Sequence, residues 1–129
     1  MAMTVYESHG SSIPGLVAAE DLTGAQFRFV TISANNRVSL ATGPDQAIGV
    51  LQNAPNVGEA AAVWGVGSIS KVVAGIALFG GSNAITSDAN GRVVPAPGGT
   101  QASSGIVLLG VDNVDELACV YLSRRSLVA

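Results

Sequence analysis

Ser68 and Lys71 are the residues of this chain with the clearest potential for chemistry. The stretch Ser68-Ile69-Ser70-Lys71 matches the Ser-x-x-Lys pattern, in which a lysine handles the proton of a nucleophilic serine. Such a pattern leaves two positions free and recurs by chance, and its companion strings Ser-Asp-Asn and Lys-Thr-Gly do not occur in this sequence. We therefore expect no catalytic residue here and no enzymatic activity.

His9 and Cys119 are each the only residue of their type. A catalytic triad needs a histidine that a third group holds in place, whereas His9 lies among small polar residues near the start of the chain. A structural zinc site needs about four Cys and His ligands, so the count excludes one. Cys119 lies in the apolar run 117–122, which predicts a small buried side chain. We expect no metal and no cofactor.

The densest acidic cluster is formed by Asp112, Asp115 and Glu116. Paired carboxylates can serve glycoside hydrolysis or bind calcium. This cluster lacks an EF-hand loop, and its Asp112-Asn113 pair is typical of a turn before a strand. We interpret the cluster as structural, with weak surface binding of calcium as the alternative.

The sequence repeats itself. Residues 56–64 return as residues 113–121, 57 positions later, and residues 31–38 return as residues 86–93, 55 positions later. Two matches in the same order at nearly equal offsets indicate a duplicated unit. The matched pairs that we expect to be structural are Arg37 and Arg92, Glu59 and Glu116, and Trp64 and Tyr121.

Arg37 and Arg92 each follow a turn that contains asparagine. Each is expected to hydrogen-bond turn carbonyls or to pair with a carboxylate such as Glu59 or Glu116, and a contact between subunits is the alternative. Trp64 and Tyr121 are expected to fill a barrel end or a subunit interface, because large aromatic side chains contribute most there. A sugar-binding platform would require both rings to be exposed.

Composition limits the classes of partner. The chain has 129 residues, enough for one domain, of which 48% are hydrophobic and only 12% are charged. A surface with so few charges suits an assembly. Six basic residues and a net charge of −3 disfavour nucleic acid, which is bound through stripes of Lys and Arg. The longest apolar run, residues 72–79, is too short to cross a membrane.

The sequence predicts an N-terminal arm, residues 1–19, and a single all-β domain, residues 20–129, with repeats at about 20–71 and 76–122. Gly10-Ser11-Ser12 and Pro14-Gly15 interrupt regular structure in the arm. Its apolar residues are expected to dock on a partner or on the chain's own barrel, and they are Val5, Tyr6, Ile13 and Leu16. The start of the chain lacks a secretory signal pattern, so the product is expected in the cytoplasm until it assembles.

Short β-branched segments bounded by turn residues predict strands. No segment has a sustained helical period. The Asn90-Gly91 pair favours a type I′ turn, because both central residues of that turn need a positive φ. We expect an all-β barrel or sandwich of two tandem related units, with strands at about 26–32, 37–40, 48–51, 60–66, 83–87, 92–94, 106–109 and 117–122.

Three blocks resemble a known family. They read Ile-Thr-Ser-Asp-Ala-Asn-Gly-Arg-Val-Val at 85–94, Gly-Ile-Val-Leu-Leu at 105–109 and Glu-Leu-Ala-Cys-Val-Tyr-Leu at 116–122. They resemble the capsid decoration, or cement, proteins of tailed bacteriophages, over about residues 20–122. The resemblance implies a virion protein without turnover that binds the major capsid protein on the outside of the mature head and stabilises it. It also implies a homo-oligomer, for which we expect a trimer.

Two other interpretations remain open. A small β-domain on a virion or cell surface, with carbohydrate-binding or hydrolytic activity, would need an aromatic or carboxylate cleft in one half that the other half lacks. A structural subunit that forms its own lattice is disfavoured, because the chain is short for a shell protein.

Overall fold

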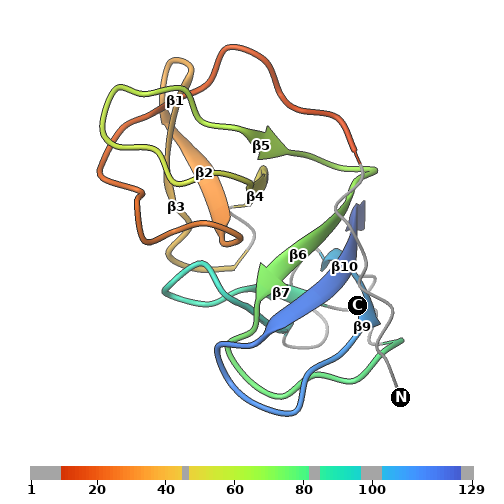
Figure 1. Ribbon diagram of the computed structural model, residues 1–129. Coiled ribbons are helices and arrows are strands. Elements are labelled where there is room, and N and C mark those ends of the chain that lie inside the picture. The colour runs from red at the N-terminus through yellow and green to blue at the C-terminus, as the bar shows by residue number, and fades with distance from the viewer. Residues whose placement is uncertain (1–9, 45–46, 82–84, 97–102, 126–129) are drawn as a thin grey trace.

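The computed structural model describes residues 10–44, 47–81, 85–96 and 103–125, with Ser103, Arg124 and Arg125 described by their backbone alone. The described ranges contain strands and turns and no α-helix, so the expected all-β fold is confirmed (Figure 1). The strands are β1 Val17–Ala18, β2 Phe29–Ala34, β3 Arg37–Leu40, β4 Gly49–Leu51, β5 Val63–Trp64, β6 Ile69–Val73, β7 Ile85–Ser87, β8 Val93–Pro95, β9 Ser103–Leu109 and β10 Leu117–Arg125.

The strands form two groups that follow one another along the chain (Figure 1). The first half makes a five-stranded sheet in the order β1-β3-β2-β4-β5. The second half makes a three-stranded sheet, β6-β10-β9, and a hairpin, β7-β8. In both halves a hairpin is followed by an antiparallel pair, β4-β5 in the first half and β9-β10 in the second. The order of the pairings therefore follows the sequence repeat.

The turn before the last strand of each half is built in the same way. The backbone N–H of Asn56 donates to Oε1 of Glu59 at 2.6 Å, and that of Asn113 donates to Oε1 of Glu116 at 2.9 Å. The third residue of both turns has a left-handed backbone, with φ of 81° at Gly58 and 68° at Asp115. The repeated glutamates are thus used within their own turns, in place of pairing with Arg37 or Arg92.

Residues upstream of position 20 also make backbone contacts that match contacts of the second half. The carbonyl of Ala18 accepts the N–H of Gly58 at 2.8 Å, and the carbonyl of Ala74 accepts that of Asp115 at 2.7 Å. Ser12 forms an antiparallel bridge with Trp64, much as Ile69 pairs with Tyr121 in the second half. The described part of the predicted arm, from Gly10 onward, therefore contributes backbone pairing to the first sheet.

The core consists of two clusters of buried apolar side chains. One lies within the first half and the other spans both halves, because Phe29 and Val50 pack with side chains of the second half. The shared cluster ties the halves into one cooperative unit. Its members are Phe29, Ala41, Ala47, Val50, Val72, Ala74, Leu78, Ile85, Val93, Val107, Ala118, Val120 and Leu122.

The Asn90-Gly91 turn differs from the expectation. Of the two residues, Gly91 alone has a positive φ, 72°, and the carbonyl of Asp88 accepts the N–H of Gly91 at 3.3 Å. The prediction of a type I′ turn is therefore wrong, because that turn needs two positive φ angles. The physical reason is the Asp88 carboxylate, whose Oδ1 accepts the backbone N–H of Asn90 and of Arg92, each at 2.8 Å.

Several strand ends also differ from the predicted ones. The first hairpin strand begins at Phe29 instead of residue 26, because Phe27 adopts φ 63° and the N–H of Arg28 bonds back to Ala25. Strand β5 is limited to Val63–Trp64, whereas β10 continues to Arg125. The ends move where a local turn competes with the sheet for the same backbone groups.

Matched glycines stand opposite the matched aromatic residues. A Cβ on Gly49 would overlap the carbonyl oxygen of Trp64, and a Cβ on Gly105 would overlap that of Tyr121. Only glycine lets the two strands approach so closely at these positions. The glycine is therefore a structural requirement of the repeated unit.

Candidate interaction surface

The serines of the Ser-x-x-Lys stretch lie on the face of β6 opposite to the lysine. Ser68 and Ser70 are buried. The hydroxyl of Ser70 donates a hydrogen bond to the carbonyl of Lys71 at 2.9 Å and accepts one from Nε2 of Gln52 at 2.8 Å. Lys71 alternates to the other face, where Nζ lies 5.8 Å from the centre of the Phe27 ring. This geometry separates the hydroxyls from the ammonium group. His9 lies outside the described residues.

Two of the three acidic residues of 112–116 are engaged in structural contacts. Asp115 pairs with Arg92, and Glu116 accepts the N–H of its own turn. Within the described ranges, no three His, Cys, Asp or Glu side chains come together as metal ligands. The described part of the chain also contains no helix with the length and apolarity that a bilayer crossing requires.

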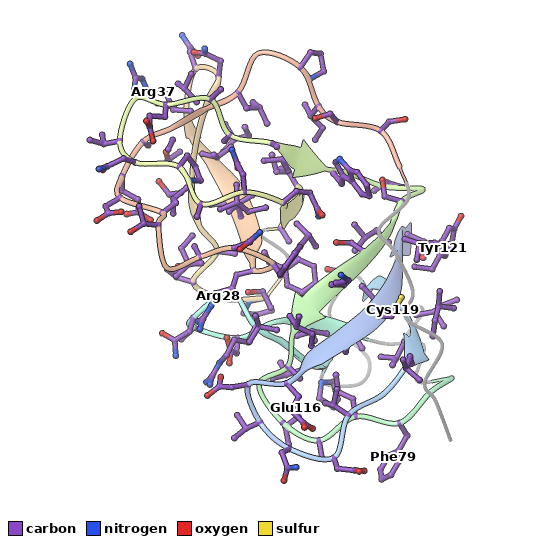
Figure 2. The ribbon with its side chains drawn as sticks, viewed as in Figure 1. Arg28, Arg37, Phe79, Glu116, Cys119 and Tyr121 are labelled. Carbon is purple, nitrogen blue, oxygen red and sulfur yellow. The ribbon has the colours of Figure 1, made fainter. Side chains whose placement is uncertain are left out.

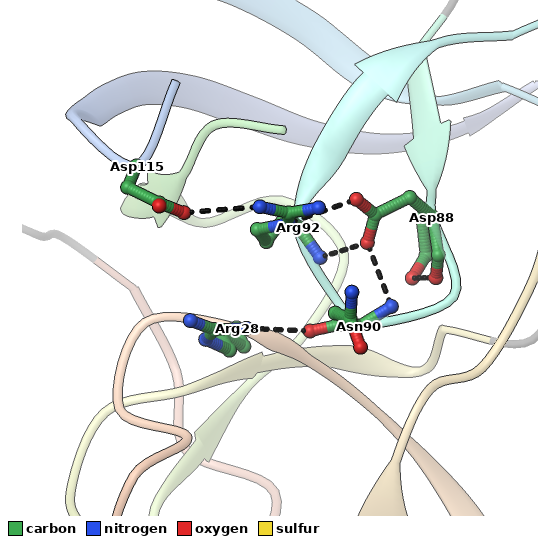
Figure 3. A network of polar contacts seen from close by, with 6 residues as sticks. Arg28, Asp88, Asn90, Arg92 and Asp115 are labelled. Carbon is green, nitrogen blue, oxygen red and sulfur yellow. Dashed lines mark hydrogen bonds and ion pairs between the residues drawn. The ribbon is translucent and has the colours of Figure 1, made fainter. Parts of the chain in front are cut away.

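Arg92 joins the second hairpin to the turn that precedes β10 (Figure 3). Its Nε lies 2.9 Å from Oδ2 of Asp88, and its Nη1 lies 3.1 Å from Oδ1 of Asp115. Hydrogen bonds to these two carboxylates, first to Asp115 and then to Asp88, raise the pKa of the guanidinium. The predicted pairing with a carboxylate is present, but the partners are aspartates instead of Glu116.

The Arg92 network also contacts the first half of the molecule. Nη1 of Arg28 donates to the carbonyl of Asn90 at 3.0 Å (Figure 3). The N–H of Phe29 donates to the carbonyl of Gly91 at 2.7 Å. Arg37, the counterpart of Arg92, is exposed, and none of the ion pairs in the described ranges involves it. The ion pairs of Arg92 therefore have no counterpart at Arg37, and the bonds from Arg28 and Phe29 join the hairpin that carries them to the first half.

Two of the predicted partner-binding residues lie against the first core cluster. Leu16 is 8% exposed within that cluster, and Ile13 packs against it. The chain itself therefore covers Leu16 and covers part of Ile13. Val5 and Tyr6 lie outside the described residues, so their contacts stay a prediction.

The matched aromatic residues differ in exposure. Trp64 is half-buried, whereas the ring of Tyr121 is exposed on β10 (Figure 2). The pair therefore does not form two equivalent platforms.

One loop has the same backbone in both halves. The N–H of Ala19 donates to the carbonyl of Val38 at 2.8 Å, and that of Gly75 donates to the carbonyl of Val93 at 2.8 Å. Three residues further on, the N–H of Leu22 donates to Pro55 at 3.0 Å and that of Leu78 donates to Val111 at 2.9 Å. Leu22 and Leu78 are both buried, so residues 20–23 and 76–79 are equivalent positions.

The two loops carry opposite kinds of side chain. In the first half, Oε2 of Glu20 accepts the N–H of Leu40 at 2.9 Å, and Oδ1 of Asp21 accepts the N–H and hydroxyl of Thr23. The hydroxyl of Thr23 and then its N–H lower the pKa of Asp21. In the second half, Ile76 and Phe79 take the positions of Glu20 and Thr23. Ile76 is 50% exposed. Phe79, which is labelled in Figure 2, is 79% exposed.

This difference makes residues 76–79, here called the apolar loop, the candidate interaction site. The first half shows that polar residues at these positions are compatible with the same backbone, so folding does not require Ile76 and Phe79 to be apolar. Exposed apolar side chains that folding does not need are typical of a binding surface. Sequence reasoning placed Phe79 in an apolar run and missed this, although aligning Ser12-Ile13 with Ser68-Ile69 would have paired the two loops.

The chain is thus a small all-β protein of two related halves, with an apolar loop on the second. No known family model matches its sequence, and no curated protein sequence matches it. A solved structure with this fold is the head fiber gp8.5 N base of bacteriophage phi29. The two superpose with a TM-score of 0.63 over 95% of this chain and 100% of that one, at 17% sequence identity. The likeness establishes a common fold.

Proposed function

We propose that this protein is a structural component of a tailed-phage virion that binds the outer surface of the mature head. The fold shared with a phage head fiber base over nearly the whole chain carries the proposal. The resemblance of three sequence blocks to capsid decoration proteins supports it independently. In this role the protein has no turnover; it is made in the host cytoplasm and bound to the head during assembly.

The proposed partner is the major capsid protein, contacted through the apolar loop. Ile76 and Phe79 supply exposed apolar surface that folding does not require, and burying it against a lattice subunit favours binding. If the protein binds the expanded lattice and not its precursor, binding stabilises the mature form by mass action. Because many copies bind to one shell, their stabilising effects on the lattice add together. We propose a homotrimer as the bound form.

Co-sedimentation tests the function directly. The purified protein is mixed with mature, DNA-filled heads and, separately, with unexpanded heads of the same phage. We expect it to pellet with mature heads and to stay in the supernatant with unexpanded ones. Equal pelleting with both, or with neither, would contradict binding to the mature lattice. Light scattering of the free protein and its copy number at each head site test the trimer.

A variant pair tests the apolar loop. Ile76→Glu with Phe79→Thr installs the residues of the equivalent first-half loop, which the same backbone accepts. We expect this double variant to keep its melting temperature and to lose at least about tenfold in affinity for heads. The control is Val57→Thr, which removes an apolar side chain that is 59% exposed in another loop and should leave binding unchanged. If the double variant binds heads as tightly as the unaltered protein, the apolar loop is not the head-binding surface.

A further inference from the structure

The Asn90-Gly91 turn combines an exposed asparagine with a glycine that the fold requires. A Cβ on Gly91 would lie 2.8 Å from the carbonyl oxygen of Phe29 and 2.6 Å from Cδ1 of Leu40, so only glycine fits there without a shift of its neighbours. The side chain of Asn90 is exposed and makes no hydrogen bond within the described part of the chain. The fold therefore fixes the glycine and leaves the asparagine amide free.

An asparagine followed by glycine is the arrangement in which deamidation meets the least steric hindrance, because the following backbone nitrogen is the attacking group. Here a bond forms between the nitrogen of Gly91 and Cγ of Asn90. The side-chain nitrogen leaves as ammonia and takes up the proton of the Gly91 amide. Water then opens the resulting cyclic imide. Cleavage of the bond from nitrogen to Cγ gives aspartate, whereas cleavage of the bond from nitrogen to the main-chain carbonyl gives isoaspartate, in which the chain runs through Cγ.

The other asparagines lack one of the two requirements. The chain has seven asparagines, and Asn90 is the one that glycine follows. Three others are hydrogen-bonded through their side chains, and they are Asn36, Asn53 and Asn56. The remaining three are followed by a residue whose side chain hinders the attack, and they are Asn35, Asn83 and Asn113. The free amide and the following glycine therefore coincide at residue 90.

Asn35 is the counterpart of Asn90 in the first half and serves as an internal control. Both asparagines are exposed. The residue after each has a left-handed backbone, with φ of 50° at Asn36 and 72° at Gly91. The two turns thus present an exposed asparagine before a left-handed residue, and they differ in whether that residue has a side chain.

The attacking nitrogen is weakly held. The N–H of Gly91 donates to the carbonyl of Asp88 at 3.3 Å, beyond the usual upper limit of about 3.2 Å for such a bond. The residues on either side are held more firmly, because the N–H groups of Asn90 and Arg92 each donate to Oδ1 of Asp88 at 2.8 Å. The nitrogen of Gly91 can therefore be released by opening one weak bond, without separation of the strands.

The same two residues join the halves of the molecule. The carbonyl of Asn90 accepts Nη1 of Arg28 at 3.0 Å (Figure 3), and the carbonyl of Gly91 accepts the N–H of Phe29 at 2.7 Å. We call these two bonds the seam. Isoaspartate adds one carbon atom to the chain between Cα of residue 90 and the nitrogen of Gly91. Because Gly91 is tightly enclosed, the longer chain displaces its carbonyl from the N–H of Phe29.

We propose that Asn90 is a site of spontaneous deamidation in the folded protein, and that the isoaspartate formed there weakens the seam between the two halves. The reaction needs water and no enzyme. It does not depend on binding to a phage head. The protein is therefore made with the seam closed and loses it slowly as Asn90 is converted.

Mass spectrometry of each asparagine tests the site. The purified protein is kept in a mildly alkaline buffer without denaturant, and samples are digested in acid at intervals. In the folded chain, Asn90 should convert to aspartate and isoaspartate at least about tenfold faster than Asn35, because glycine lets the nitrogen approach. Equal rates at the two positions would overturn the proposal. So would an Asn90 that stays intact in the folded chain and reacts only in urea.

A matched variant transfers the reactivity to the first half. Asn36→Gly places a glycine after Asn35 at a φ of 50°, which glycine adopts readily. Asn35 should then react faster than in the unaltered protein, while the rate at Asn90 stays the same. If Asn35 remains as slow as before, the following side chain does not control the reaction, and the assignment of Asn90 is wrong.

Thermal unfolding of the separated products tests the effect on the seam. The isoaspartyl form, identified by enzymatic methylation of isoaspartate, should melt at a lower temperature than the unaltered protein. Asn90→Asp adds the same charge with a normal chain and should melt close to the unaltered protein. Asn90→Ser cannot form the imide, so its melting temperature should not fall during the same incubation. If the isoaspartyl form melts with the unaltered protein, the modification does not weaken the seam and the proposal fails.

Discussion

Two matched glycines, one in each half, leave no room for a Cβ atom. Gly49 and Gly105 are required because a Cβ at either position would overlap the carbonyl of the facing aromatic residue. We expect Gly49→Ala and Gly105→Ala each to lower the free energy of unfolding by about 1–3 kcal/mol, the usual cost of overpacking. Urea denaturation measures this. Gly24→Ala is the control, since a Cβ there meets no atom within 4 Å and its stability should be unchanged.

The two carboxylates bound by Arg92 should contribute unequally. The Asp88 side chain is 19% exposed and also accepts two backbone N–H groups, whereas that of Asp115 is 61% exposed and makes one ion pair. Asp88→Asn should cost about 1–2 kcal/mol of stability, because a hydrogen bond to a charged group is lost in a half-buried site. Asp115→Asn should cost less than about 1 kcal/mol, as exposed ion pairs do. Equal losses in thermal unfolding would contradict this ranking.

Cys119 should titrate above the ordinary range of a thiol. Burial raises the pKa of Cys119, and the nearby Lys71 ammonium lowers it by a smaller effect. Because the fold favours the neutral thiol, its contribution to stability is complete below the pKa of the unfolded thiol, about 8.5, and is lost as pH rises through the folded pKa. Thiolate absorbance should give a midpoint above the pKa of the unfolded thiol. Lys71→Met should move the midpoint higher, and Cys119→Ser serves as the blank.

At the scale of elements, the two Asn-x-x-Glu turns should respond alike. Each glutamate accepts the N–H of the asparagine three residues before it. Glu59→Ala and Glu116→Ala should each cost about 1 kcal/mol, because one charge-assisted hydrogen bond is removed near the surface. Glutamine at either position keeps an acceptor and should cost less. A large difference between the two sites in chemical denaturation would mean that the turns are not equivalent.

Eight of the ten described strands were predictable because they are short β-branched runs between turn residues, whereas β1 and β6 were not among the predicted strands. The sequence repeat predicted the matched turns. The pairing of Ser12 with Trp64 was missed, because Pro14 and Gly15 are typical of an irregular segment. The bond from Arg28 to Asn90 joins residues 62 positions apart, and no local pattern indicates such a contact. The exposure of Phe79 depends on which side of the loop faces the core, which only the tertiary structure determines.

At the scale of the whole molecule, the position of a truncation decides whether the chain folds. A chain that starts at Gly10 keeps the bridge from Ser12 to Trp64 and the buried side chain of Leu16. We expect it to melt cooperatively. A chain that starts at Val17 loses both, and burying Leu16 alone is worth about 2 kcal/mol, so it should melt at a clearly lower temperature or not fold. Circular dichroism measures both. Equal melting temperatures would show that residues 10–16 add no stability.

The pairing of β10 also has a mechanical consequence. This nine-residue strand pairs with β6 over residues 117–121 on one side and with β9 over residues 119–125 on the other. Its hydrogen bonds lie perpendicular to the strand, so a pull on the chain beyond Arg125 loads many of them in shear at the same time. A pull on residue 10 instead meets the two-residue strand β1 and isolated bridges, which yield one after another. The molecule therefore responds differently to force at its two ends. It resists force applied at the end of β10, whereas force applied at residue 10 separates the strands one after another.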